Sequence, residues 1–174
     1  MRDLSSVEPS SASVKRRGYD SPEALFRAQY VPLCRILSVF CGDQEEAADA
    51  AQEAFVQAWL KWSRVSGLEK PEAWLRRVAV NRLLNGRRSL SRRAVALLRL
   101  QPRESAVDVD GRLDLAAALR TLPARQRMAV VLRYVGDLSV AEIGEAMGVA
   151  EGTVHRHLHR GRSRLRELLG ARYE

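Results

Sequence analysis

Residues 138–169 read LSVAEIGEAMGVAEGTVHRHLHRGRSRLRELL, and this stretch decides the fold. Ser139 and Glu142 have the spacing of a capping box, which marks the start of a helix. Gly148 follows after a short helical segment and can take the left-handed conformation that ends a helix. A second helix is expected after it, because apolar residues recur at helical spacing in Val154, Leu158, Leu165 and Leu168. The stretch therefore predicts a helix-turn-helix over residues 139–158.

The second helix of this motif carries an excess of positive charge. Between Ala150 and Arg172 there are six arginines and two acidic residues. A helix that is merely solvated usually mixes both signs, because opposite charges one turn apart attract each other. The excess therefore favours a helix that binds nucleic acid over the alternative, which is a pair of ordinary packed surface helices.

The whole chain is also basic. Its 174 residues include 29 Lys and Arg against 21 Asp and Glu, which gives a net charge of +8 and an isoelectric point near 10.3. This balance points to a polyanionic partner, and to nucleic acid before a membrane surface. Nine arginines and no acidic residue lie between Arg76 and Arg103, so we expect a second basic surface apart from the helix-turn-helix.

The sequence predicts neither export nor membrane insertion. Residues 1–19 are polar, contain the basic run 15–17 and lack the apolar segment of a signal peptide. We find no apolar run that approaches the length of a membrane span. Cys34 and Cys41 are too few for a disulfide framework and are expected to be buried thiols in a reducing compartment. The predicted location is the cytoplasm.

Helical periodicity continues over the rest of the chain, so we predict an all-α fold. Apolar residues recur at helical spacing in five further segments, at residues 21–41, 44–62, 72–88, 112–121 and 123–135. Trp59 and Trp62 fall on an apolar stripe and are expected in the core. We therefore predict two small helical domains joined by a linker, in the order tail 1–19, domain 20–95, linker 96–111 and domain 112–174.

Two sets of motifs follow one another in a fixed order. The first half carries A-x-D-x-x-Q-x-x-F-x-x-x-W at residues 47–59 and W-L-x-x-V-A-x-N at residues 74–81. The second half carries L-x-x-L-P-x-x-Q-R at residues 119–127, followed by L-R-Y, L-S-x-x-E-I and G-T-V. From about Ser21 to Leu169 the chain thus resembles the extracytoplasmic-function (ECF) sigma factors of the sigma-70 family. The implied function is to bind core RNA polymerase, to recognise the −10 and −35 promoter elements and to promote DNA melting.

The resemblance implies roles for residues of the first domain, which corresponds to sigma region 2. The helix with the Asp-x-x-Gln motif would dock on the polymerase, and an acidic strip suits a basic partner surface. The docking residues would be Asp49, Gln52, Glu53 and Phe55. The next helix would melt and read the −10 element through Arg77, Asn81 and Arg88, while the loop at 65–70 would accept a flipped base.

The second domain corresponds to sigma region 4, whose helix-turn-helix would read the −35 element. Side chains near the start of its second helix enter the major groove, so the base edges would be read by His155, Arg156, His159 and Arg160. Phosphates would be held, without readout of sequence, by Arg127, Thr153 and Arg162. No cofactor is expected. No metal site is expected either, because no third acidic or thiolate ligand accompanies the histidines.

Three positions depart from the family pattern: Ala48 and Asn85 replace a usual Glu and a common Asp, and Ala150 stands where a capping Ser or Pro is usual. One competing function is a helix-turn-helix repressor or activator with an all-α dimerisation domain, which leaves the Asp49 strip unexplained. An enzyme acting on nucleic acid is not expected, because no paired carboxylates, Cys-His couple or phosphate loop stands out. An anti-sigma factor is a further partner that the resemblance allows.

Overall fold

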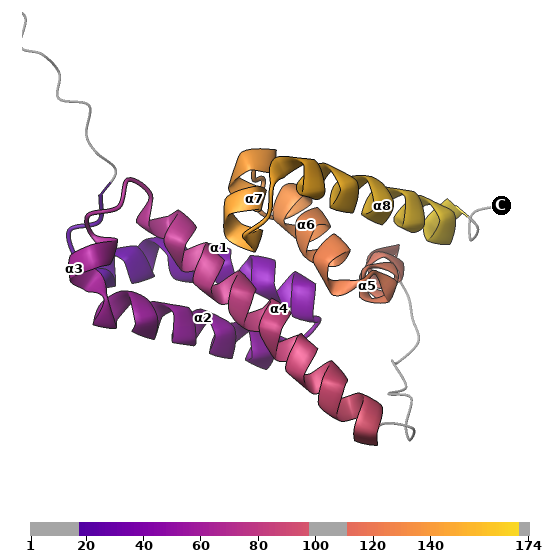
Figure 1. The fold of residues 1–174 in the computed structure, drawn as a ribbon, viewed down its shortest axis with the longest axis horizontal. Helices are drawn as coiled ribbons and strands as arrows, with labels where there is room; N and C mark the ends of the chain where they lie inside the picture. The colour runs from indigo at the N-terminus through magenta and orange to yellow at the C-terminus, as the bar shows by residue number, and fades with distance from the viewer. Residues whose placement is uncertain (1–17, 98–110, 171–174) are drawn as a thin grey trace, which may run out of the picture.

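The computed structural model of the protein describes residues 18–97 and 111–170, and their side chains over 18–86 and 115–170. Within these ranges the secondary structure is helical, without a β-strand, so the prediction of an all-α fold is confirmed (Figure 1). The helices are α1 (Pro22–Cys41), α2 (Gln44–Leu60), α3 (Trp62–Val65), α4 (Pro71–Leu97), α5 (Gly111–Thr121), α6 (Ala124–Tyr134), α7 (Val140–Met147) and α8 (Glu151–Gly170).

The hairpin of α1 and α2 begins and turns as the sequence predicts. The Ser21 side chain accepts a hydrogen bond from the Ala24 amide and caps α1, with Pro22 in the first turn. Gly42 ends α1 with a φ of 72°, a left-handed conformation that suits glycine. The Asp43 carboxylate then caps α2 by accepting from the amides of Glu45 and Glu46. These local signals fix where the two helices of the hairpin begin.

By length and composition alone, helix α1 could also cross a membrane. One such helix is weak evidence, because the core helix of a globular domain passes the same test. Here the apolar face of α1 packs into the core through Leu25, Leu33, Ile36, Leu37 and Phe40, all of which are buried. We therefore interpret α1 as a core helix.

Helix α4 is longer than predicted. The sequence pattern indicated an end near Arg88, but the helix continues to Leu97. The extension consists mostly of Arg, Ala, Leu and Ser, and the next proline is Pro102, so no residue in it breaks the backbone hydrogen bonding. The side chain of Arg88 lies outside the described residues, as do the tail at 1–17 and most of the predicted linker.

The helix-turn-helix is confirmed as α7, a tight turn and α8. Ser139 and Glu142 form the predicted capping box, and Gly148 has a φ of 64°. Gly144 is buried at the crossing of the two helices, where an added Cβ would lie 2.9 Å from the Val149 carbonyl oxygen. The motif therefore requires a residue without a side chain at position 144.

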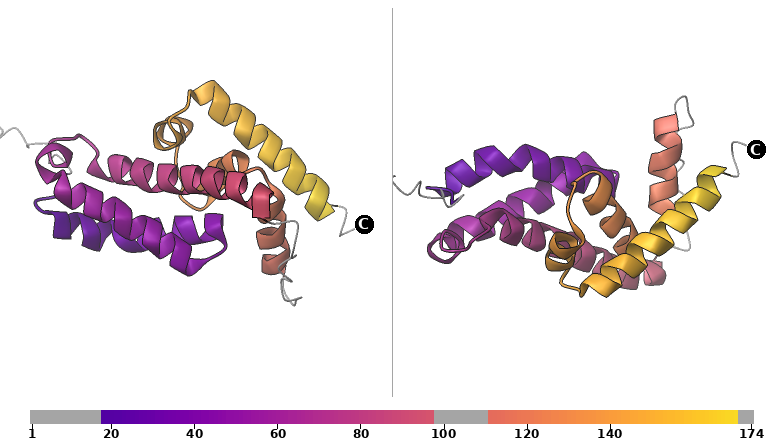
Figure 2. Two further views of the ribbon diagram at one scale, coloured as in Figure 1. Left: turned by 60° about the horizontal axis from the view of Figure 1, so that its bottom comes forward. Right: turned by 90° about the horizontal axis from the view of Figure 1, so that it is seen from above.

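The two halves of the chain, predicted as two helical domains joined by a linker, pack against each other. Helix α6 packs on α1, and α7 packs on α4 (Figures 1 and 2). One cluster of buried apolar residues runs through both halves. At their junction Arg35 donates a hydrogen bond to the Val135 carbonyl oxygen at 3.3 Å. The halves therefore share a core in this structure.

Replacing Gly144 by alanine tests how closely α7 and α8 pack. We expect Gly144→Ala to lower the free energy of unfolding by about 1–3 kcal/mol, the usual cost of overpacking a filled site. The control is Gly152→Ala, where an added Cβ meets nothing within 4 Å. Because alanine is the better helix former, the control should be at least as stable as the wild type. Equal unfolding curves in guanidinium for both variants would contradict this packing.

Candidate nucleic-acid and protein interfaces

The outer side of α8 presents the side chains that were predicted to read bases. His155, Arg156, His159 and Arg160 are exposed, and Val154 and Leu158 bury the opposite side of the helix. Arg156 donates a hydrogen bond to the Thr153 hydroxyl at 3.0 Å, which orients its guanidinium along the first turns of α8. We call these four exposed residues the recognition face. Its cations and imidazoles suit contacts with base edges and phosphates.

His157 lies on the flank of α8, between the recognition face and the core. Its partial burial lowers the pKa of the imidazole, and the nearby guanidinium groups of Arg125, Arg156 and Arg160 lower it further. The imidazole is therefore held in its neutral form at a pH at which an ordinary histidine begins to titrate. Sequence reasoning did not single out this residue, because its environment depends on α6.

The packing removes one predicted phosphate contact from the surface. Arg127 is only 5% exposed, donates to the Arg120 carbonyl oxygen at 3.1 Å, and lies over the Phe40 ring at 4.9 Å. The prediction that it holds a phosphate is wrong for this structure, because its guanidinium is enclosed by the core. Arg162 is exposed, lies three residues after His159 on the same side of α8, and lines a groove on the flank of that helix, so its phosphate contact stays a prediction.

That groove is an apolar surface that sequence reasoning missed. It lies between α5, α6 and α8 and is lined mainly by aliphatic side chains. Tyr134 is 60% exposed and Leu115 is 44% exposed beside it. We call this surface the C-terminal groove.

The acidic strip of α2 divides between two sides of the helix. Asp49 and Gln52 are both exposed, and Gln52 lies near the Tyr30 hydroxyl of α1. Glu53 is turned toward α4 and forms an ion pair with Arg82. The predicted strip is therefore narrower than the sequence suggested, because a basic side chain of the neighbouring helix engages one of its carboxylates.

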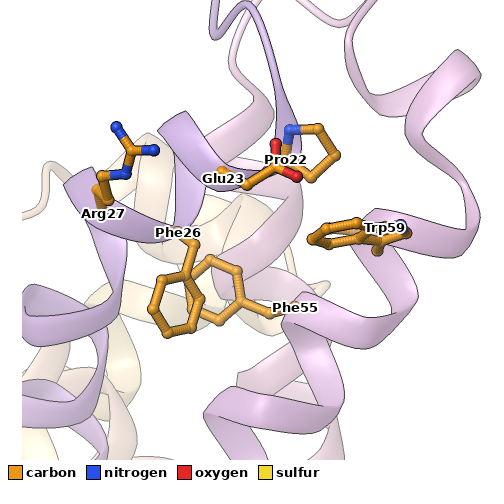
Figure 3. A pocket seen from close by; sticks show the side chains of 7 residues that line it. Pro22, Glu23, Phe26, Arg27, Phe55 and Trp59 are labelled. Carbon is orange, nitrogen blue, oxygen red and sulfur yellow. The ribbon is translucent and has the colours of Figure 1, made fainter.

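An aromatic groove lies at the start of α1, between α1 and α2 (Figure 3). Phe55, predicted as a docking residue, is only 8% exposed, because its ring packs at 4.9 Å from Phe26 and 6.0 Å from Tyr30. Trp59 was predicted in the core, and this is wrong: it is 58% exposed at the rim of the groove. Trp62 is partly buried against the core. Helical periodicity does not show where α1 begins above α2, and the start of α1 leaves Trp59 at the rim of the groove.

Helix α4 presents its predicted −10 residues in two places. Asn81 lines a polar pocket between α2 and α4. Arg77 reaches toward the turn of the helix-turn-helix, where a Cβ added at Gly148 would lie 4.0 Å from its Nη2. In this region the pKa of Glu142 is lowered mainly by hydrogen bonds from Ser139, with smaller contributions from Arg76 and Lys70. Arg77 and Asn81 therefore share a helix but not a pocket.

Comparison with known proteins agrees with this architecture. Residues 25–93 match the Sigma-70 region 2 family, and residues 112–165 match the Sigma-70, region 4 family. The chain is 32% identical over 167 residues to the ECF RNA polymerase sigma factor SigL of Mycobacterium tuberculosis, covering 91% of this chain and 90% of SigL.

Two solved structures have a similar fold. The sigma factor RpoE in complex with the anti-sigma factor NepR from Bartonella quintana superimposes with a TM-score of 0.66 at 23% identity, covering 85% of this chain and 98% of RpoE. CnrH in complex with the cytosolic domain of CnrY gives a TM-score of 0.60 at 25% identity, covering 87% and 91% of the two chains.

The lowered pKa of His157 gives a prediction for the pH dependence of stability. As the pH falls through 6.5, the ordinary pKa of histidine, His157 of the unfolded chain binds a proton, whereas His157 of the folded chain stays neutral. The free energy of unfolding should therefore decrease between pH 7 and pH 5, and His157→Gln should reduce that decrease. The matched control is His155→Gln, at an exposed position of the same helix, which should retain the wild-type slope. If His157→Gln kept the wild-type dependence of the free energy of unfolding on pH, burial of the His157 imidazole would not be the cause of that dependence.

Proposed function

We propose roles for these surfaces from one premise: the chain belongs to the ECF RNA polymerase sigma factors of the sigma-70 family. It is an RNA polymerase sigma factor, with core RNA polymerase and promoter DNA as its partners. The comparisons support this function over a helix-turn-helix repressor with a dimerisation domain. Sigma factors are transcription initiation factors and are not catalytic enzymes by themselves. We propose the cytoplasm as the site of action.

The recognition face of α8 is proposed to read the −35 element in the major groove. The observation that carries this assignment is the exposure of Arg156 and Arg160 on the second helix of a helix-turn-helix. A guanidinium can bond both acceptors of a guanine edge, and contacts of this kind fix sequence preference. Thr153 and Arg162, which lie beside the recognition face, are proposed to contact the phosphates.

Docking on the polymerase is proposed to use Asp49, Gln52 and the aromatic groove together. The carboxylate and amide give a polar edge, and Trp59 and Phe26 expose apolar surface beside it. An exposed aromatic surface with a polar rim has the composition of a protein interface. The partner chemistry that fits is a basic surface with an apolar side chain that enters the groove.

Reading both promoter elements requires the two halves to separate. The elements are named for positions about 25 base pairs apart, which is roughly 85 Å of duplex at 3.4 Å per pair. A compact domain of this size has a radius of gyration of only about 15 Å. We therefore propose that the shared core opens when the protein assembles with polymerase and promoter.

An anti-sigma factor is proposed as a further partner. CnrH, at 25% identity, was solved with the cytosolic domain of CnrY. The aromatic groove and the C-terminal groove are exposed apolar surfaces on the two halves of this chain and offer places for such a protein.

Run-off transcription tests the proposed function. Core polymerase with this protein should initiate from a subset of promoter fragments, whereas core alone and the protein alone should not. Equal transcription by core polymerase with and without the protein would overturn the function.

Charge reversal at Asp49 tests the docking surface. Asp49→Arg should weaken binding to core polymerase by about tenfold or more, because it places a cation against a basic partner surface. The matched control is Glu69→Arg, an equal charge change at an exposed position outside the strip and groove. The measurement is a titration of labelled core polymerase with each folded variant. Equal affinities for the two variants would place the docking surface elsewhere.

Alanine substitutions on α8 test the −35 assignment. Arg156→Ala or Arg160→Ala should relax the preference at one or two −35 positions, at a cost of about 1–3 kcal/mol in discrimination. Arg162→Ala should leave the preference unchanged, because its side chain lines the C-terminal groove. The measurement is transcription from a promoter library with each −35 position varied. Three identical sequence profiles would mean that the recognition face does not enter the major groove.

A further inference from the structure

We propose that Arg120 and Arg127 form a latch that holds the free protein in a closed, inactive arrangement by seating on the C-terminal end of α1. The proposal rests on the sigma factor function and deepens it, because it assigns a regulatory contact to the protein before assembly. Both arginines belong to the second half of the chain, and the end of α1 around Phe40 and Gly42 belongs to the first half. We call this set of residues the arginine latch.

Arg127 reaches across the junction of the two halves. Its guanidinium carbon lies 4.9 Å from the centre of the Phe40 ring, and Phe40 is fully buried. A cation over an aromatic face is attracted by the ring, and the attraction is stronger where water is excluded. The hydrogen bond from Arg127 to the Arg120 carbonyl oxygen, at 3.1 Å, orients the guanidinium. Arg127 therefore ties α6 to α1 in addition to completing the core of its own half.

Arg120 covers the last turn of α1. A Cβ added at Gly42 would lie 3.4 Å from Nη1 of Arg120. The C-terminal end of a helix carries a partial negative charge that a nearby cation stabilises, yet α1 has no basic residue in its own last turn. The corner that follows is acidic, with Asp43, Glu45 and Glu46 at the start of α2. The second half of the chain thus supplies a positive charge to the negative end of α1.

The other contact between the halves, α7 against α4, is less favourable. It brings the cations Arg76 and Arg77 of α4 close to α7. The Nε of Arg76 is buried and has no hydrogen-bond partner among the residues that the structure describes. A buried donor without a partner costs free energy, because it has lost its hydrogen bonds to water. The arginine latch, rather than this contact, therefore holds the halves together.

The closed arrangement limits assembly, because both promoter elements cannot be read while α7 stays against α4. A closed molecule must open before it assembles with core polymerase and promoter. The apparent dissociation constant of such a protein equals the intrinsic constant divided by the fraction of open molecules. Weakening the latch should therefore tighten assembly, which is the opposite of the effect of removing a binding residue.

The test compares the full-length protein with variants that each lack one contact at this junction. Phe40→Leu removes the aromatic face, Arg120→Ala removes the cation over the end of α1, and Arg35→Ala removes a hydrogen bond between the halves. Each should raise the fraction of open molecules by about fivefold, the scale of one cation–π or charged hydrogen-bond contact. Small-angle X-ray scattering measures this fraction through the radius of gyration, and the Phe40→Leu/Arg120→Ala double variant should be open in most molecules.

A titration of core polymerase and a promoter fragment gives the second readout. Each single variant should assemble more tightly than the wild type by the factor that its open fraction gains. The matched control is Arg164→Ala, which removes an exposed arginine whose ion pair with Glu167 lies within α8. The control should keep the radius of gyration and the assembly of the wild type.

A double-mutant cycle tests the contact between Arg127 and Phe40 itself. If Arg127 acts through the ring, Phe40→Leu should change the open fraction much less in an Arg127→Ala background than in the wild type. A role of Arg127 confined to its own half would make the two effects additive. Should Arg127→Ala fail to fold, Arg35→Ala and Arg120→Ala decide the question, because both side chains are exposed.

The outcomes distinguish the latch from the function on which it rests. If the wild type initiates transcription, but the folded variants are as compact as the wild type or assemble no more tightly, the latch alone is overturned. Weaker assembly by the folded variants would overturn it as well, because these residues would then bind a partner. If the protein does not assemble with core polymerase at all, the proposed function is overturned, and the radius of gyration still decides whether the latch exists.

Discussion

The packing of α6 against α1 is the contact on which the arrangement of the two halves depends. Arg127 stands at its centre, enclosed by the core, with its guanidinium over the Phe40 ring and bonded to the Arg120 carbonyl oxygen. A buried cation is tolerated only where such partners replace water, so α1 and α6 must meet in this register for Arg127 to be accommodated. The same contact turns the recognition face of α8 outward and brings α7 against α4.

The functional surfaces follow from this arrangement. The aromatic groove lies between α1 and α2, and Asp49 is exposed on α2. The polar pocket lies between α2 and α4, and the recognition face lies on α8. Each surface is assembled from side chains that a rigid helical core positions, which is how a small all-α protein can present three binding sites at once. If the two halves separate on assembly with polymerase and promoter, as proposed, the contact between α1 and α6 must break.

Much of the fold could be predicted from the sequence, because its signals are local. The capping box at Ser139, the left-handed Gly148 and the cap at Ser21 each act within four residues, and each is found where the pattern placed it. The motif order likewise identified the family. What failed depends on contacts between distant segments: the burial of Arg127 requires Phe40, the orientation of Glu53 requires Arg82, and the exposure of Trp59 depends on where α1 begins. Periodicity tells which side of a helix is apolar, but not which neighbour covers it.

Directed DNA cleavage is the most direct test of whether this chain places α4 at the −10 element and α8 at the −35 element. With Cys34 and Cys41 replaced by alanine, a single cysteine at Lys61 or at Ser163 would carry an iron chelate that cleaves nearby DNA in the open complex. With the two helices in these places, we expect cleavage around the −10 element from position 61 and around the −35 element from position 163. Cleavage of the same region from both positions, or of neither element from either one, would contradict it.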